Sequence, residues 1–255
     1  NPHFTLKLAY CLNKKFNLPY VLDFRDLWSD HLFKSNPKLT FAEKIQDYIT
    51  RWYWKKWIRQ SKSYSITSEE WLSILNKMSG KSGHVIRNGF EDELLTIKAD
   101  KTSYFSVGCM GTFYKNQDLE TFLFGLRQFL ESLDHQNKKH IKLSCLGLST
   151  NYRSQIQKEI TDIISTENVE FLPRTDGLRA FEFCKSQTIL WHPTFPDADG
   201  WFSAKLYDYI ASQTTLVCCP ADGGIVERTL GVFSHVHFVN SSEDAKEILS
   251  HLFNK

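Results

Sequence analysis

Several features that would narrow the class of protein are missing from this chain of 255 residues. The formal net charge at pH 7 is only +2, so a dominant electrostatic footprint for nucleic acid is not expected. No apolar run approaches the length of a membrane span, and no signal peptide is recognisable. The six cysteines form no C-x-x-C pair and show no metal-ligand spacing. Free thiols in or beside strands fit a reducing cytosol, and we therefore expect a cytoplasmic protein rather than a disulfide scaffold.

The chain also lacks an initiating methionine, since it opens at Asn1 and Pro2, and its first clear strand follows a helix-like segment. We expect that part of the first domain precedes Asn1 in the full protein. What the chain has in abundance is aromatic side chains, with 19 Phe and 7 Trp, which is ample material for a sizeable core.

The second half of the sequence alternates between strand-like and helix-like segments. Six strands are predicted, at residues 105–110, 141–146, 169–172, 188–192, 215–219 and 235–239. Six helices are predicted, at residues 119–133, 152–165, 177–184, 203–211, 224–230 and 242–253. The alternation predicts a doubly wound parallel sheet, in which ligands bind beyond the carboxyl ends of the strands. Gly111, Arg174 and the loops 193–203 and 220–224 follow such ends, so one crevice is expected to gather them.

The first half is less regular. It predicts strands at residues 20–24, 63–66 and 84–86 and helices at residues 41–60 and 69–78. A turn at Arg87-Asn88-Gly89 and a polar stretch up to residue 103 mark a domain boundary. We expect a partial Rossmann-like domain over residues 1–95 and a second Rossmann-like domain over residues 96–255.

The stretch of residues 189–220 carries the clearest chemical signal. An apolar strand leads through a loop into a helix for which Ser203 is a good N-cap residue. Lys205 then lies in the first turn, where the helix dipole repels a cation, so an anion such as phosphate is expected to come there. Asp208 shares a face with Lys205 and suits a ribose hydroxyl. The combination favours a nucleotide, although a solvated lysine at an ordinary helix start is the plainer alternative.

Four segments resemble motifs of a known family. LPYVLDFRDLWSD (18–30) is similar to a PxVxDFRDxW segment, and HVIRNGFEDE (84–93) to a V-I-x-N-G-h-D segment that enters an interdomain linker. FSVGCMGTFYKNQDLETFLFGL (105–126) looks like the strand, glycine turn and helix that open a nucleotide domain. SAKLYDYIASQTTLVC (203–218) resembles an xxKlfEYlAsgkPil helix and strand. On these motifs the chain resembles bacterial retaining glycosyltransferases of the large family 4 type.

The resemblance implies the GT-B architecture, with the family's first strand and glycine-rich loop having no counterpart here. It implies an enzyme, a glycosyltransferase of hexosyltransferase type, that moves a sugar from a nucleotide-diphosphate sugar to a glycan or lipid-linked acceptor in bacterial surface polysaccharide synthesis. No required metal or other cofactor is implied. The expected donor-binding residues are Gly111, Thr112, Arg174, Gly200, Trp201, Phe202, Ser203, Leu206 and Asp208.

Several of these residues depart from the family pattern. Asp208 stands where the family usually has a ribose-binding Glu, and Gly200 where it often has a second acidic residue, with Asp197 and Asp199 just before it. Thr112 replaces the usual Arg after the glycine turn, and Lys115 is the nearest substitute for its charge. Lys205 and Lys115 are expected to stabilise the departing diphosphate.

On the acceptor side, Asp23, Arg25 and Asp26 follow the strand at residues 20–24. Asp23 or Asp26 could accept the proton of the acceptor hydroxyl, with Arg25 orienting it. An internal Asp–Arg pair that anchors the loop explains the same residues equally well. His3 and His192 are weaker candidates, because lone histidines are more often structural.

The segment 51–59, RWYWKKWIR, is dense in Trp and cations. Arg51, Lys55 and Arg59 recur every four residues and form a basic stripe. Contact with the inner face of the plasma membrane is one explanation, because Trp suits the interface and cations suit anionic lipid. A core helix with a solvated basic face is the other.

Two other functions remain open beside the transferase. A non-catalytic GT-B subunit that binds or scaffolds would fit the departures at Gly200, Thr112 and Asp208. A nucleotide-sugar 2-epimerase shares the architecture, but a Ser-Gly-Gly type phosphate loop is expected there, and the sequence has Asp-Gly-Trp-Phe-Ser.

Overall fold

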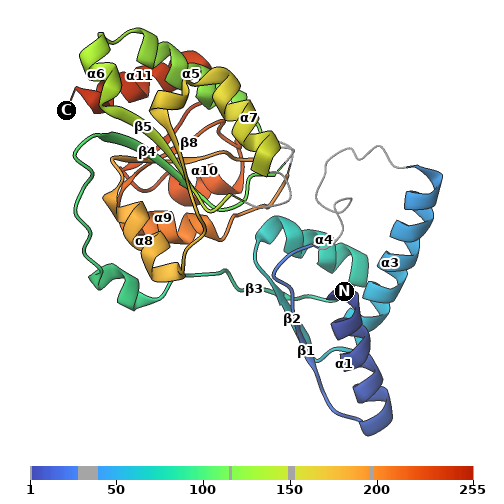
Figure 1. Cartoon of the computed structure of the whole chain (residues 1–255). Coiled ribbons are helices and arrows are strands. Elements are labelled where there is room, and N and C mark those ends of the chain that lie inside the picture. Colours follow the sequence, from blue (N-terminus) through green and yellow to red (C-terminus); the bar gives the residue numbers. More distant parts are fainter. Residues whose placement is uncertain (1, 28–39, 115–116, 149–152, 196–197, 255) are drawn as a thin grey trace. The chain divides into compact units, whose positions relative to one another are not determined.

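The computed structural model describes residues 2–27, 40–114, 117–148, 153–195 and 198–254 (Figure 1). The chain divides into two compact units. The smaller unit consists of Asn1–Asn88 together with Asp197–Phe202, and the larger unit of Gly89–Pro196 together with Ser203–Lys255.

The larger unit is built on a six-stranded sheet with the order β6-β5-β4-β7-β8-β9, in which every neighbouring pair is parallel. The order reverses between β4 and β7, which is where doubly wound sheets leave a crevice for ligands. The prediction of a six-stranded doubly wound parallel sheet is confirmed. The strands are β4 (Phe105–Met110), β5 (Ile141–Leu146), β6 (Val169–Leu172), β7 (Ile189–His192), β8 (Thr215–Cys218) and β9 (Val236–Phe238).

Helices cover both faces of this sheet. Figure 1 shows α5, α7 and α11 over one face and α8 and α9 over the other. The helices are α5 (Glu120–Glu131), α6 (His135–Lys139), α7 (Arg153–Ile163), α8 (Gly177–Ser186), α9 (Lys205–Ser212), α10 (Ile225–Leu230) and α11 (Ser242–Phe253), with short 3-10 turns η1 (Asp92–Thr96) and η2 (Thr166–Asn168).

The core of the larger unit explains why its strands could be predicted from the sequence. Apolar residues alternate along the inner strands, and Val107, Leu143, Trp191 and Val217 are fully buried. Trp191 stacks on Phe122 of α5 with ring centroids 4.5 Å apart. Five of the six cysteines are buried free thiols, whereas Cys11 is exposed. These thiols pack as small apolar residues, as expected.

The smaller unit has a three-stranded parallel sheet with the order β1-β2-β3. Its strands are short, and its helices pack on the sheet through a separate aromatic core that includes Phe24, Trp54, Tyr64 and Trp71. The elements are α1 (Pro2–Phe16), β1 (Val21–Asp23), α3 (Phe41–Gln60), β2 (Ser63–Ile66), α4 (Glu69–Ser79) and β3 (His84–Val85). Thr40 begins α3 with a capping box, in which its side chain and that of Glu43 bond reciprocally to backbone N–H groups.

Candidate functional site

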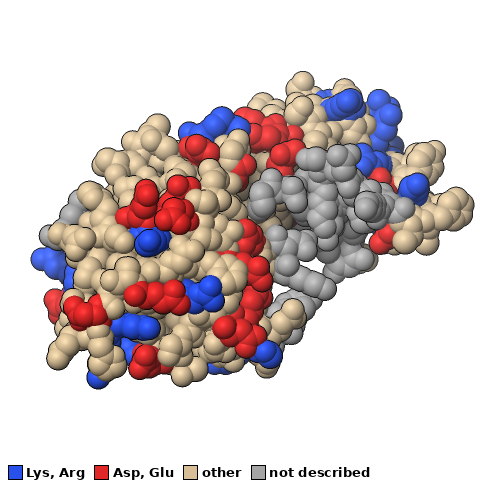
Figure 2. Space-filling view, turned by 90° about the horizontal axis from the view of Figure 1, so that it is seen from above, with Lys and Arg blue, Asp and Glu red and all other residues tan. Residues whose placement is uncertain are grey.

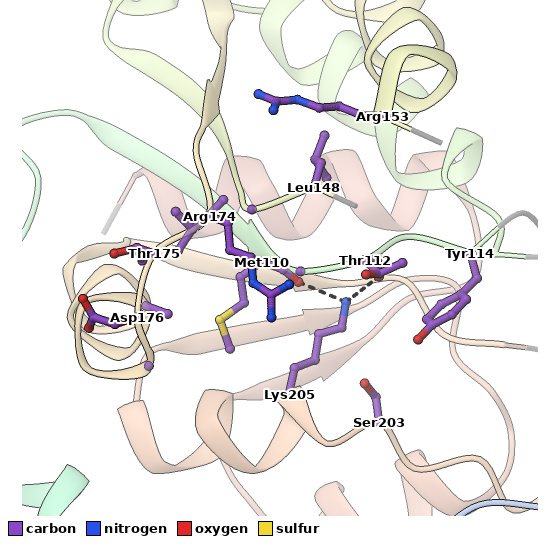
Figure 3. Close-up of a pocket in the computed structure, with 15 residues that line it drawn as sticks. Met110, Thr112, Tyr114, Leu148, Arg153, Arg174, Thr175, Asp176, Ser203 and Lys205 are labelled. Carbon is purple, nitrogen blue, oxygen red and sulfur yellow. Dashed lines mark hydrogen bonds between the residues drawn. The ribbon is translucent and has the colours of Figure 1, made fainter. Parts of the chain in front are cut away.

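A cavity of about 570 Å³ opens at the carboxyl ends of β4, β5 and β6, entirely within the larger unit (Figure 3). Three strand-end loops and the starts of α7 and α9 surround it, as expected for a doubly wound sheet. Its lining residues are Met110, Gly111, Thr112, Tyr114, Leu146, Gly147, Leu148, Arg153, Arg174, Thr175, Asp176, Gly177, Ala180, Ser203 and Lys205.

Gly111 forms the turn at the end of β4. Its φ is +80°, in the left-handed region that favours glycine, and its N–H donates to the Leu146 carbonyl at 2.8 Å. A Cβ at this position would meet no atom within 4 Å, so the space above the glycine is open. A ligand can therefore approach the backbone of this turn closely.

Lys205 is the first residue of α9, and its side chain crosses to the end of β4. Its Nζ donates to the carbonyl oxygens of Met110 at 3.1 Å and Thr112 at 3.3 Å, and lies 5.5 Å from the centre of the Phe113 ring. Figure 3 shows the ammonium between the two carbonyls at the floor of the cavity. Burial lowers the pKa of Lys205 to about 8. A cation held in this way is poorly solvated and is suited to an anionic ligand.

Two arginines add to the positive charge of the cavity. Arg174 follows β6 and Arg153 begins α7, and both line the cavity. In Figure 3 the Arg174 side chain extends toward Lys205, whereas the Arg153 side chain lies farther away, beyond Leu148. Neither forms an ion pair or a hydrogen bond within the part of the chain that the structure describes. The carboxylate that lines the cavity, Asp176, instead caps α8 through the N–H of Arg179 and pairs with the Arg179 guanidinium at 3.6 Å. Lys205, Arg153 and Arg174, here called the cationic triad, leave the cavity with excess positive charge.

The predicted helix start at Ser203 was wrong by two residues. Helix α9 begins at Lys205, and Ala204 takes the N-cap position without a side-chain hydrogen bond. Ser203 contributes its backbone carbonyl, which accepts from the N–H of Leu206 at 3.0 Å, while the residue also lines the cavity. The serine hydroxyl is therefore available to a ligand instead of serving as a cap.

The other expected donor residues of α9 lie outside the cavity lining. Leu206 is fully buried beneath the helix, and Asp208 is half-buried one turn along it. Burial raises the pKa of the Asp208 carboxyl. The sequence-predicted residues that the cavity brings together are Gly111, Thr112, Arg174, Ser203 and Lys205.

The segment of Gly200, Trp201 and Phe202 belongs to the smaller unit. Trp201 meets Trp71 edge-on at 6.0 Å, and the Trp71 Nε1 donates to the Asp199 carbonyl at 2.7 Å. Gly200 has φ +77°, and a Cβ there would lie 2.7 Å from Trp71 and 2.9 Å from Glu70. The glycine is thus required for close packing against the start of α4.

The acceptor-side candidates also lie in the smaller unit. Arg25 pairs with Asp23 at 2.7 Å and donates to the side chain of Asn88 at 3.1 Å, while the Ser65 hydroxyl donates to Asp23 at 2.6 Å. The Asp–Arg pair considered from the sequence is present, and it leaves Asp23 at half exposure. Partial desolvation raises the pKa of Asp26.

Two sequence candidates fall elsewhere. Lys115 and the side chain of His3 lie outside the described residues. His192 is buried at the end of β7 and does not line the cavity, and burial lowers the pKa of its imidazole well below the usual range. The sequence analysis did not identify Arg153. The argument used for Lys205 also applies to Arg153, because it is likewise a cation in the first turn of a helix that follows a strand.

Metal and membrane signatures were sought over the same described residues. None of their His, Cys, Asp and Glu side chains gather in groups of three or more that could hold a metal ion. None of their helices combines the length and apolar character needed to cross a bilayer.

Comparison with known proteins rests on structure alone. No protein-family model matches the sequence, and no curated protein matches it. The structure of Anabaena Alr3699/HepE in complex with UDP aligns with a TM-score of 0.66 at 15% identity, over 98% of this chain and 66% of that one. Trehalose-6-phosphate synthase OtsA aligns with a TM-score of 0.65 at 12% identity, over 97% and 61% of the two chains. WaaG, a glycosyltransferase involved in lipopolysaccharide biosynthesis, aligns with a TM-score of 0.60 at 11% identity, over 97% and 72%.

These similarities, together with the two Rossmann-like units, define the class of fold. The chain has the GT-B fold, as the sequence motifs led us to expect. It spans about two thirds of the length of the structures that it matches, from 61% of OtsA to 72% of WaaG.

Proposed function

We propose that this protein is a nucleotide-sugar glycosyltransferase whose cavity in the larger unit holds the diphosphate of the donor. The observation that carries the proposal is that Lys205, Arg153 and Arg174 line one cavity at the carboxyl ends of β4, β5 and β6. Two of these cations have no partner among the described residues, and the third has a lowered pKa. For Lys205, a desolvated positive charge without a carboxylate partner is costly unless a ligand supplies the negative charge.

The expected role of the cations in the transfer reaction follows from where negative charge develops on the donor. Breaking the bond between the sugar and the diphosphate leaves a growing negative charge on the nucleotide, and preorganised cations stabilise it. Lys205, held by two backbone carbonyls, is already positioned for this task. We infer that the sugar is transferred with retention of its anomeric configuration, by attack on the same face from which the nucleotide leaves. This route requires no carboxylate nucleophile, and we infer that it also requires no metal.

UDP is the first donor nucleotide to test, because the HepE structure holds UDP and has the same fold at low identity. A hexose is the inferred sugar, and a glycan or lipid-linked acceptor of a bacterial surface polysaccharide is the inferred acceptor. Asp23 and Asp26 in the smaller unit are the proposed acceptor-side carboxylates, with Arg25 holding Asp23 in place. Asp208 is the proposed ribose contact.

The proposal is tested by titrating the chain with UDP, GDP, ADP and CMP and with their common sugar conjugates, using calorimetry. We expect one nucleotide diphosphate to bind, and Arg174→Ala and Lys205→Ala each to weaken it roughly ten- to hundredfold, the usual worth of a hydrogen bond to a charged group. Arg127→Ala, on the exposed surface of α5 and paired with Glu131, is the matched control and should bind normally. If no nucleotide binds to the folded chain, the proposal is wrong.

A non-catalytic GT-B subunit is the second candidate. Two observations favour it: Thr112, which lines the cavity, brings no charge to it, and Asp208 does not line it. Measuring UDP release from a UDP-sugar that binds separates the two functions. Binding without hydrolysis or transfer to a broad set of acceptors would support the subunit.

A further inference from the structure

The cavity of the larger unit has two chemically different ends. At one end lie the Lys205 ammonium and the open turn at Gly111, the groups proposed to hold the diphosphate. The loops after β5 and β6 and the starts of α7 and α8 form the other end. Arg153 belongs to that second end, because in Figure 3 its side chain lies beyond Leu148 and farther from Lys205 than the Arg174 side chain. Its hydrogen-bond donors are therefore directed at a different part of a bound nucleotide.

The wall beside Arg153 is suited to a flat ring. Leu146 and Leu148 line the cavity while remaining less than a tenth exposed, so they present apolar surface on a fixed support. Gly147 between them has φ +69°, and a Cβ there would lie 3.4 Å from the Arg174 Cα. No side chain therefore rises between the two leucines. Ligand pockets combine such apolar surface with a few polar groups, and the base is the flat, partly apolar portion of a nucleotide.

Arg153 brings donors to this wall without internal partners. It is the first residue of α7, whose first turn has no acidic residue, and its guanidinium forms no hydrogen bond or ion pair among the residues that the structure describes. The carboxylate of the cavity, Asp176, is engaged by Arg179 and by the cap of α8. A guanidinium has five N–H donors and no acceptor, so Arg153 can recognise only an acceptor atom on a ligand.

A solvated arginine on a basic surface is the plainer explanation for Arg153. On the face of the larger unit seen in Figure 2, however, acidic and basic side chains are interspersed. Arg127 of α5 and Lys158 of α7 each pair with a carboxylate four residues further along the same helix. The corresponding position for Arg153 is occupied by Gln157, which carries no charge. Arg153 thus differs from these surface cations in having no counter-charge on its own helix at this spacing.

We propose that Arg153 is a specificity-determining residue that donates to a keto oxygen of the donor base. The cavity then takes uracil or guanine nucleotides in preference to cytosine or adenine nucleotides. Uracil O4 and guanine O6 are acceptors, whereas cytosine and adenine carry an amino group at the same place. That amino group would point its donors at the donors of the guanidinium and leave both unpaired. The inference rests on the proposed function, because it requires a nucleotide in the cavity.

Matched pairs of nucleotides test this role. UDP and CDP carry the same phosphates and differ at C4 of the base, and inosine diphosphate and ADP differ in the same way at C6. In calorimetry with the whole chain, the keto member of at least one pair should bind at least roughly tenfold more tightly, the usual worth of a hydrogen bond to a charged group. Arg153→Leu should bring that ratio close to one by weakening the keto nucleotide.

Pyrophosphate, which has no base, separates base recognition from a contact with phosphate. Arg153→Lys keeps the charge but loses the planar fork of the guanidinium, so it should lower the ratio while binding pyrophosphate as wild type does. Lys205→Ala should weaken both members of each pair and pyrophosphate by the same factor, and so keep the wild-type ratio. Arg127→Leu on the exposed surface of α5 is the matched control and should equal wild type in every titration.

Circular dichroism and the melting temperature establish that each variant is folded. Equal wild-type affinities within both pairs, or an unchanged ratio in Arg153→Leu, would overturn the role of Arg153 and leave the proposed function standing. Equal weakening of UDP, CDP and pyrophosphate in Arg153→Leu would assign the residue to the diphosphate instead. If wild type binds no nucleotide at all, the proposed function is wrong and this inference falls with it.

Discussion

At the scale of single residues, Lys205 carries the most chemical information. Its ammonium is removed from water and is held by two carbonyl oxygens, which offer partial negative charge but no full counter-charge. Its pKa therefore falls from 10.5 to about 8, within reach of ordinary experiments. Arg153 and Arg174 line the same cavity.

A pH dependence of nucleotide binding follows from this lysine. An anionic diphosphate favours the protonated ammonium, so binding raises the pKa of Lys205 and takes up a proton when the free protein is above pH 8. Affinity for UDP should change little between about pH 7 and pH 8 and should fall by up to about tenfold per pH unit above about pH 8.

Calorimetry in two buffers of different ionisation enthalpy measures this proton uptake directly. Lys205→Met should bind more weakly and show no such uptake, because the titrating group is gone. Equal uptake in wild type and Lys205→Met would mean that another group titrates.

At the scale of elements, the strand-end loops are held in place by hydrogen bonds that link distant segments. The side chain of Gln117 donates to the Pro193 carbonyl at 2.6 Å and accepts from the N–H of Tyr114 at 2.9 Å. This amide thereby ties the loop after β4 to the loop after β7, the two strands at the reversal point. The start of α9 is likewise set by backbone bonding, since Ser203 contributes its carbonyl and leaves its hydroxyl free of a capping role.

Replacing a serine by alanine at the starts of two helices distinguishes a serine that caps its helix from one that does not. Ser203→Ala should change the free energy of unfolding by less than about 0.5 kcal/mol, because no capping bond is lost. Ser241→Ala should cost about 1 kcal/mol, because the Ser241 hydroxyl accepts from the N–H of Asp244 at the start of α11. Urea denaturation measures both values, and a larger loss for Ser203→Ala would show that its hydroxyl does cap α9.

At the scale of the whole molecule, the chain has two cores that share no residue. The larger core centres on Trp191 and Phe122, and the smaller one on Trp54, Tyr64 and Trp71. The cavity is lined by the larger unit alone. The proposed donor site therefore lies within one of the two separately packed bodies.

Scanning calorimetry should reveal this division. UDP at about a hundred times its Kd should stabilise the larger unit by about 2.7 kcal/mol and raise the melting temperature of its transition. The transition of the smaller unit should move little. Lys205→Ala should reduce the stabilisation of the larger unit to about 0.4 to 1.4 kcal/mol at the same UDP concentration, since its binding is expected to be ten- to hundredfold weaker. A single transition that UDP shifts as a whole would show that the two units unfold as one cooperative body.

Much of this fold could be predicted from the sequence, because the apolar pattern of each strand depends only on residues that are close together in the chain. The buried alternation of Val107 and Cys109 in β4, and the apolar run of β7 from Ile189 to Trp191, identify strands without knowledge of their neighbours. The rule that parallel strands end at one edge then brought Gly111 and Arg174 into the same crevice, where the structure places them.

What the sequence by itself determined was therefore the order of the elements, the parallel sheet and the edge at which a ligand site forms. Tertiary structure decided which side chains enter that site. Lys205 and the carbonyl of Met110 are 95 residues apart, and only the packing of α9 against β4 brings them together. The same packing places Asp208 away from the lining and Gly200 in the smaller unit. Periodicity depends on neighbours along the chain, whereas the direction of a side chain depends on the elements packed around it.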